Sequence, residues 1–296
     1  MRNQVIRIGV IGIMVWLWGA SASLAAGREK IGVGVATFTD QTRKNLAGPA
    51  TDYVTETFVR LKYFRVLERS QMDQVLKELA RQQSDLVDEK TAVELGRHLG
   101  AQATVVGSVS GAGYNVTKES CTRYENGKAI KATCLEAKAT ATLNVRMVKI
   151  ETGEVMFSEV LTGSANKTYQ PGSQPEPEAA LIDEALRRAA HDLYGPVQKA
   201  FPLIGTVVKK DGQMIWVDLG SDWGVKRGRG MIIRKLKGEE IKNPRTGELV
   251  GYTHPEVAHD SCSEVTPEMC RMKVSKKEAE KIKEGQIAEA KPEFWY

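Results

Sequence analysis

The stretch AQATVVGSVS, residues 101–110, decides the fold class of this chain. Nearly every residue in it is apolar or small, without the regular polar alternation of a strand that has one face in water. Such a run is typical of a strand that is covered on both faces, as in sheets flanked by helices. We therefore expect a central strand here.

Upstream, strand patterns alternate with helix patterns. IGVGVATFTD (31–40) predicts a first strand, a helix should follow over 49–61, and residues 64–66 predict a short strand. Two further helices are expected over 70–84 and 88–99, because each has a capping residue and an apolar stripe. This order predicts an α/β domain with a mixed sheet and flanking helices.

Downstream, the pattern changes to antiparallel ribbons. Two long runs, 112–125 and 128–150, are followed by a turn at 151–155 and a third run at 155–163. A polar, proline-rich loop at 166–178 comes next. A helical stripe then predicts a helix that covers the sheet: Ala180, Leu181, Leu186, Ala190 and Leu193.

These patterns divide the chain into an α/β domain over 26–200 and a small all-β domain, a barrel or a sandwich, over 201–296. In the second domain, Asp211-Gly212 indicates a hairpin and NPRTGE (243–248) another turn. Three later stretches predict strands: 250–265, 269–274 and 286–291.

Basic residues gather in the second domain: Lys226, Arg227, Arg229, Arg234, Lys235 and Lys237. We interpret them as exposed residues at strand edges that prevent edge-to-edge pairing. A nucleic-acid patch is the alternative. The formal charge of +5, or +3 once Arg2 and Arg7 are removed, is too mild to favour it, and we expect no nucleic-acid partner.

The first 25 residues resemble a cleaved secretory signal. Arg2 and Arg7 precede an apolar run of about a dozen residues (8–19), which is too short to span a bilayer as a helix, and small residues lead to Ala25. We expect cleavage after Ala25 or one residue later; an uncleaved anchor or a lipoprotein signal are the alternatives. Export would place the mature chain in the periplasm, where disulfides persist.

Four cysteines, Cys121, Cys134, Cys262 and Cys270, form two close pairs along the chain. Four cysteines allow three connectivities, of which pairing within each close pair is the simplest. Neither pair has the spacing of a zinc site. We expect disulfides, and we expect no spanning segment after the signal.

The first pair encloses the polar ribbon CTRYENGKAIKATC, 121–134. With Gly127-Lys128 in the centre of the turn, Cys121 would face Cys134 directly, and a glycine in the first central position suits a type II′ turn. With Asn126-Gly127 central, Cys121 would face Ala132, and Cys134 would lie on the diagonal. We predict the Gly127-Lys128 register. Both faces of the ribbon carry charged or polar residues, so the ribbon should lie in water or against a polar protein surface.

The sequence gives little support for a catalytic, cofactor-binding or metal-binding site. Gly32 and Gly34 lack the third glycine and the later acid of a dinucleotide site. Asp218 and Asp222, which flank a glycine, fit turn chemistry at least as well as a metal site. The histidines are interpreted as surface residues: His98, His191, His254 and His259. We assign no catalytic, cofactor-binding or metal-binding residue and expect no enzymatic activity.

The run FRVLERSQMDQVLKELARQQS…AVELGRHLGAQATVVGSVS (64–110) resembles the curli-secretion component family, CsgG and HfaB, and the related TolB amino-terminal-like envelope proteins. VRMVKIETGEVMFSEVLTGSA (145–165) is similar to the paired strands of that family around a T-G-E turn. The resemblance covers about residues 30–200. It implies an α/β fold and a role in the cell envelope.

The tail is similar to the carboxy-terminal domain of flagellar assembly protein T, through WVDLG (216–220), GVKRGRGM (224–231), NPRTGELVG (243–251) and KIKEGQIAEAK (281–291). The curli-type pore differs from this chain in two ways: it carries a lipid on an amino-terminal cysteine, and it inserts two amphipathic hairpins per subunit.

We therefore expect a non-enzymatic periplasmic assembly or accessory protein of the envelope or of an appendage, with association with the outer membrane as an alternative to a free periplasmic location. Its partners would be other assembly proteins, and a homo-oligomer is expected by family analogy. The alternatives are an outer-membrane secretion pore subunit of the curli type, and an envelope hydrolase or ligand-binding protein.

Overall fold

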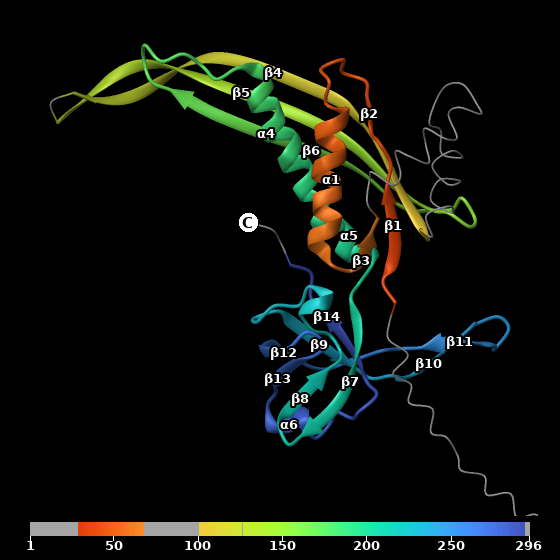
Figure 1. The fold of residues 1–296 in the computed structure, drawn as a ribbon. Helices are drawn as coiled ribbons and strands as arrows, with labels where there is room; N and C mark the ends of the chain where they lie inside the picture. Colours follow the sequence, from red (N-terminus) through yellow and green to blue (C-terminus); the bar gives the residue numbers. More distant parts are fainter. Residues whose placement is uncertain (1–28, 68–100, 126, 294–296) are drawn as a thin grey trace, which may run out of the picture.

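The computed structural model describes residues 29–67, 101–125 and 127–293. They form a mixed sheet with helices on one face and, below it, a closed all-β barrel (Figure 1). The predicted fold class is confirmed. The helices expected over 70–84 and 88–99, the signal segment and His98 lie outside the described residues.

The sheet has the order β3-β1-β4-β5-β6, and β2 pairs beside β4. Strand β1 runs parallel to both of its neighbours, β3 and β4. Along the rest of the sheet, β5 runs antiparallel to β4 and to β6. The sheet strands are β1 (Ile31–Val35), β2 (Thr39–Asp40), β3 (Phe64–Val66), β4 (Ala103–Glu125), β5 (Lys128–Lys149) and β6 (Val155–Tyr169).

Strand β4 is longer than the sequence pattern predicts. The runs expected at 101–110 and 112–125 are one strand of 23 residues, and its pairing with β5 shifts once, between Val109 and Gly111. This β-bulge absorbs one residue without ending the strand. Strand β6 likewise continues to Tyr169, into the segment expected to be a loop.

Within the described residues, the helices that accompany the sheet are α1 (Ala47–Leu61), α4 (Glu178–Asp192) and α5 (Tyr194–Ala200). Both long helices bury an apolar face against the strands. Of the stripe predicted for α4, Leu181, Leu186 and Ala190 are buried in the helix and Leu193 is buried just after it, whereas Ala180 is exposed, which corrects the prediction at that position. The Tyr53 hydroxyl of α1 donates a hydrogen bond to Asp183 of α4 over 2.6 Å. Burial, and then this bond, raise the pKa of Tyr53 to about 12.

Helix α4 packs closely on the sheet because β6 has a glycine beneath it. A Cβ atom at Gly163 would lie 2.0 Å from the carbonyl oxygen of Ala185. Small residues on β5 continue this contact surface: Ala137, Ala139 and Ala141 are all buried. The small side chains let the helix backbone approach the strands.

The barrel closes in the order β12-β13-β8-β7-β14-β9, with the short helices η1 and α6 at its ends. A separate hairpin, β10–β11, projects from it (Figure 1). The elements are β7 (Ile204–Asp211), β8 (Met214–Val217), η1 (Ser221–Trp223), β9 (Gly230–Arg234), β10 (Glu240–Lys242), β11 (Leu249–Tyr252), β12 (Glu256–Val265), β13 (Cys270–Lys273), α6 (Lys276–Ala279) and β14 (Ile287–Ala290).

The basic cluster of the barrel is not uniformly exposed, which corrects the sequence interpretation. Arg229 is only 3% exposed. Arg234 is half-buried and pairs with Glu289 over 2.8 Å. The other four residues of the cluster are exposed: Lys226, Arg227, Lys235 and Lys237.

Candidate functional site: a disulfide-bonded arm

The most distinctive surface is the end of the β4–β5 ribbon. We call the described residues of 117–133 the arm. In Figure 1 the ribbon runs past α4 and tapers to the tip of the arm, far from the barrel. Apart from a few half-buried positions, the residues of the arm are exposed. Its shape therefore cannot come from a hydrophobic core.

The base of the arm is held by a network around Glu176, just before α4. The backbone N–H of Glu176 donates to the Tyr169 hydroxyl (3.0 Å), and its carbonyl accepts from the Tyr114 hydroxyl (3.3 Å). The carboxylate of Glu176 forms an ion pair with Lys167, and this hydrogen bond raises the pKa of Lys167. Strands β4 and β6 are thus both tied to the segment before α4, where the helix cover ends.

The Cys121–Cys134 disulfide lies at the same level, with 5.8 Å between the two Cα atoms. Cys134 is fully buried, and its Sγ lies 3.9 Å from Oε1 of Gln170. Cys121 is half-buried. The bond therefore clamps the ribbon where it leaves the covered part of the sheet.

The predicted register of this ribbon is wrong. Glu125 pairs with Lys128, so the strands join between these two residues, and Cys121 faces Ala132. Asn126 itself lies outside the described residues. Asn-Gly is the preferred pair for such a loop, and Gly127 has a positive φ of 77°. A Cα separation of 5.8 Å lies in the middle of the range for disulfides, so the diagonal position suits the bond better than direct opposition.

Each cross-strand partner lies two residues away from the predicted one, because the loop is displaced by one residue. An even displacement leaves each side chain on the face that the sequence predicted. One face of the arm includes Arg123 and Ile130, which are cross-strand partners; the other includes Tyr124. Tyr124 is 74% exposed. Four basic and two acidic side chains give the arm a net charge of +2: Lys118, Arg123, Lys128 and Lys131 against Glu119 and Glu125.

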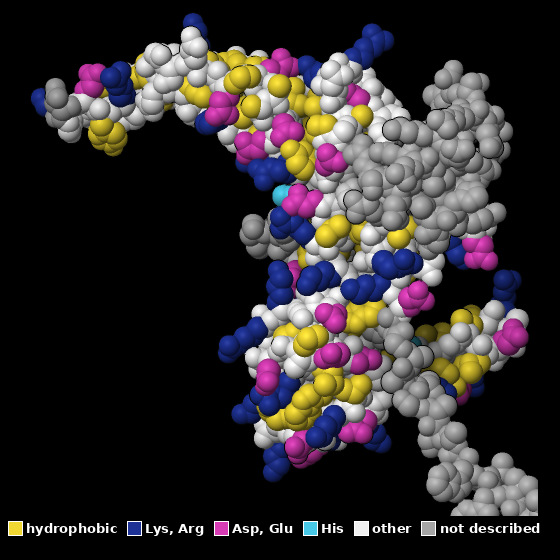
Figure 2. Space-filling model, in the orientation of Figure 1, with side chains coloured by type: hydrophobic (Ala, Val, Ile, Leu, Met, Phe, Trp, Pro, Cys, Tyr) yellow, Lys and Arg dark blue, Asp and Glu magenta, His cyan; other side chains and the backbone are white. Residues whose placement is uncertain are grey.

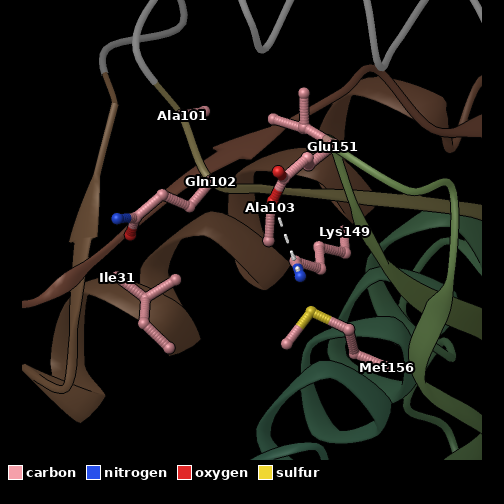
Figure 3. Close-up of a pocket in the computed structure, with 8 residues that line it drawn as sticks. Ile31, Ala101, Gln102, Ala103, Lys149, Glu151 and Met156 are labelled. Carbon is pink, nitrogen blue, oxygen red and sulfur yellow. Dashed lines mark ion pairs between the residues drawn. The ribbon is translucent and has the colours of Figure 1, made fainter.

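Towards the barrel side of the sheet, a cavity of about 590 Å³ opens beside the β5–β6 turn. Its lining is mostly apolar and includes Ile31 and Met156. In Figure 3, Lys149 and Glu151 lie at its side as an ion pair, 3.6 Å apart. This lining offers an apolar surface with one charged pair, rather than a nucleophile next to a base.

The other candidates from the sequence lie apart from the arm. The Asp218 carboxylate accepts a hydrogen bond from the backbone N–H of Thr206 and so joins two barrel strands. His254 and His259 are exposed, and His191 is half-buried, with its pKa lowered chiefly by burial. In the described ranges, no group of three or more histidine, cysteine or acidic residues could hold a metal ion.

Comparison with known families supports the sequence resemblance. The family described as curli production assembly/transport component CsgG matches residues 19–172, slightly more than half of the chain. The chain belongs to this CsgG family. The match does not extend to the tail, so the similarity of the tail to flagellar assembly protein T stays a prediction.

Several solved structures are similar in part. The LpoB C-terminal domain from Salmonella enterica is 19% identical with a TM-score of 0.32, over 47% of this chain and 87% of that one. A PelC dodecamer from Paraburkholderia phytofirmans is 13% identical with a TM-score of 0.26, over 54% and 86%. TolB from Acinetobacter baumannii is 8% identical with a TM-score of 0.28, over 87% and 60%. No curated protein sequence matches the chain.

The second disulfide, Cys262–Cys270, joins β12 to β13. Both of its cysteines are buried in the barrel. Both bonds thus link near neighbours along the chain, the simplest of the three connectivities. In the described part of the chain, no helix is both long enough and apolar enough to cross a membrane.

Proposed function

We propose that this protein is a non-enzymatic assembly or accessory protein of the cell envelope or of an appendage, and that it acts through protein–protein contacts. The observation that carries the proposal is the arm, a ribbon that extends beyond its own helix cover and is clamped at its base by a disulfide. Figure 2 shows charged side chains of both signs toward its tip. Membership of the CsgG family supports a role in assembly.

The chemistry of the arm supports a protein partner. Its exposed residues combine an aromatic ring, Tyr124, and an aliphatic side chain, Ile130, with charges of both signs. Aromatic anchors within a polar rim are typical of protein interfaces. Charged residues on both faces are unfavourable in lipid, which supports contact with water or protein.

We further propose that the chain is exported to the periplasm, that its signal segment is cleaved, and that it forms a homo-oligomer. Two disulfides support export, because such bonds persist in oxidising compartments. Within the described residues, β6 is the last strand of the sheet and pairs only with β5. Its outer edge offers backbone groups to another strand. A mass that corresponds to a monomer, measured by light scattering at high protein concentration, would contradict the homo-oligomer.

The lack of enzymatic activity is also a proposal. Three polar side chains support it, because their hydrogen bonds join structural elements and so give them a structural role: Asp218, Arg229 and Gln198. The alternative function is a secretion pore subunit of the curli type, which the transport role in the family description favours. Channel currents from the purified protein in planar bilayers would support the pore.

The arm can be tested with photo-crosslinking residues in native cells. We expect a benzoylphenylalanine at position 124 or 130 to capture a discrete envelope protein, identified by mass spectrometry. The same group in place of Val208, which is 43% exposed on barrel strand β7, is the matched control. Capture from the barrel position but from neither arm position would contradict the proposal.

A further inference from the structure

A buried polar cluster lies where the barrel meets the α/β part. Arg229 precedes β9, and its Nη2 donates to the Tyr63 hydroxyl (2.9 Å) and to Oε1 of Gln198 (2.8 Å). Its Nη1 pairs with Oε2 of Glu293 over 2.8 Å. The four residues come from different parts of the chain: the end of α1, helix α5, the barrel and the segment after β14.

Gln198 also binds the backbone of Glu293 at two points. Its Oε1 accepts from the N–H of Glu293 over 3.0 Å, and its Nε2 donates to the carbonyl over 2.9 Å. Just before, the N–H of Lys291 donates to the carbonyl of Gly230 on the barrel. Residues 291–293, which we call the strap, thus run from the barrel to α5.

Two further polar contacts across this junction lie at the surface. Lys30 and Lys62 each donate from an exposed ammonium group to a carbonyl of η1, over 2.6 and 3.2 Å. Exposed contacts of long side chains contribute little, because solvent screens them and ordering them costs entropy. The chain crosses the junction at residues 201–203, between α5 and β7.

We propose that the strap is a lock that fixes the barrel on the α/β part, with Gln198 and Arg229 as its receptor. A buried guanidinium requires a counter-charge. Nη1 and Nη2 of Arg229 have partners in this cluster, whereas its buried Nε has no hydrogen-bond partner among the described residues, so the Glu293 carboxylate supplies the compensation for the charge. Without the Glu293 carboxylate, Arg229 would keep only neutral partners at this site, and opening the junction would return its charge to water. The lock therefore sets the direction in which the barrel lies relative to the arm.

The test measures the distance between the two parts in the full chain by double electron–electron resonance. Spin labels replace Val59 on α1 and Val208 on β7, which are 54% and 43% exposed. The four native cysteines are bonded in pairs, so only the new ones react. We expect one narrow distance distribution in the otherwise native chain.

Glu293→Lys should give a broad distribution with a second population, because it places a like charge beside Arg229. Glu293→Gln, which keeps the backbone bonds to Gln198, should give a smaller second population. Glu280→Lys, an exposed change on the barrel, is the control and should leave the distribution narrow. An unchanged narrow distribution in Glu293→Lys would overturn the lock. If that variant does not fold, an unchanged distribution in Glu293→Gln would overturn it equally.

Discussion

Strands β4 and β5 pass through two different environments, and the contrast explains how the arm is built. Near their junction with the helices, β5 presents buried residues such as Leu143 and Val145 to the helix side. In the arm, the same strand presents Lys131 and Ala129, both exposed. Helix packing stabilises the first half, whereas pairing of the strands and one disulfide stabilise the second.

The largest expected effect is on the contact between helix and sheet. In Gly163→Ala, the new Cβ would lie 2.0 Å from the Ala185 carbonyl oxygen, so α4 must move. We expect the free energy of unfolding to fall by about 3 kcal/mol, at the upper end for overpacking. Urea unfolding followed by circular dichroism measures this.

The matched control is Gly111→Ala, in which the nearest atom, Oγ1 of Thr142, would be 3.5 Å from the new Cβ. That change should alter stability by less than about 1 kcal/mol. If both variants lost the same free energy of unfolding, close packing of α4 on the sheet would not be what stabilises the covered half of the ribbon.

A second pair of variants compares the two halves along β5 itself. Leu143→Ala empties a fully buried position and should cost about 3 kcal/mol of unfolding free energy. Ile130→Ala in the arm should cost less than about 0.5 kcal/mol, because its side chain already contacts water. Thermal unfolding of both variants gives the comparison, and a loss at Ile130 as large as that at Leu143 would refute it.

The disulfide prediction concerns local as well as global stability. Replacing Cys121 and Cys134 by serine removes a crosslink that restricts the unfolded chain by roughly 3 kcal/mol. We expect the free energy of global unfolding to fall by up to about this amount, and we expect the increase in hydrogen exchange to be concentrated at the backbone amides of 118–125 and 127–133. Hydrogen exchange measured by mass spectrometry tests this. If the amides of the arm stayed as protected as in the native chain, strand pairing alone would hold the arm.

The equivalent change at Cys262 and Cys270 is the control for this experiment. Its cysteines are buried among core residues of a closed barrel, and the loop they close is shorter. Removing this bond should lower the stability of the barrel and leave hydrogen exchange in the arm unchanged. The two bonds have the same Cα separation, 5.8 Å, so their different effects would reflect their surroundings.

The sequence predicted elements well and their exact pairing less well. The apolar stripes of α1 and α4 were visible because helical spacing places them on one face. Both hairpin loops were misplaced by one residue along the chain: the arm turns between Glu125 and Lys128, and the barrel turns at Gly212-Gln213 rather than at Asp211-Gly212. A glycine fits either central position of such a loop, so pairing further along the strands settles the register.

The buried cluster at the junction could not be predicted in this way. Arg229 stands among several basic residues that look alike in the sequence. Its partners Tyr63, Gln198 and Glu293 are remote along the chain, and the contact between barrel and α/β part alone brings them together. The arm, by contrast, was recognisable because its cysteines and its turn are neighbours in sequence.

The smallest expected effect is at the loop that leads into α1, on the covered side. The carboxylate of Asp40 accepts hydrogen bonds from the backbone N–H groups of Thr42, Lys44 and Leu46. Burial raises the pKa of Asp40, but the hydrogen bonds from Thr42, Leu46 and Lys44 outweigh it, and the pKa is lowered. A depressed folded-state pKa contributes stability above the unfolded value of about 4, and this stability is lost as the pH falls through the folded value.

Asp40→Asn should therefore lower the free energy of unfolding by about 1 kcal/mol at neutral pH. The difference from the native chain should shrink as the pH falls below about 4, because the native carboxyl then becomes neutral as well. Urea unfolding of both chains at a series of pH values measures this difference. A difference that stays constant through the acid range would show that the charge of Asp40 adds nothing, and that the entry to α1 is held, like the arm, by backbone pairing and shape.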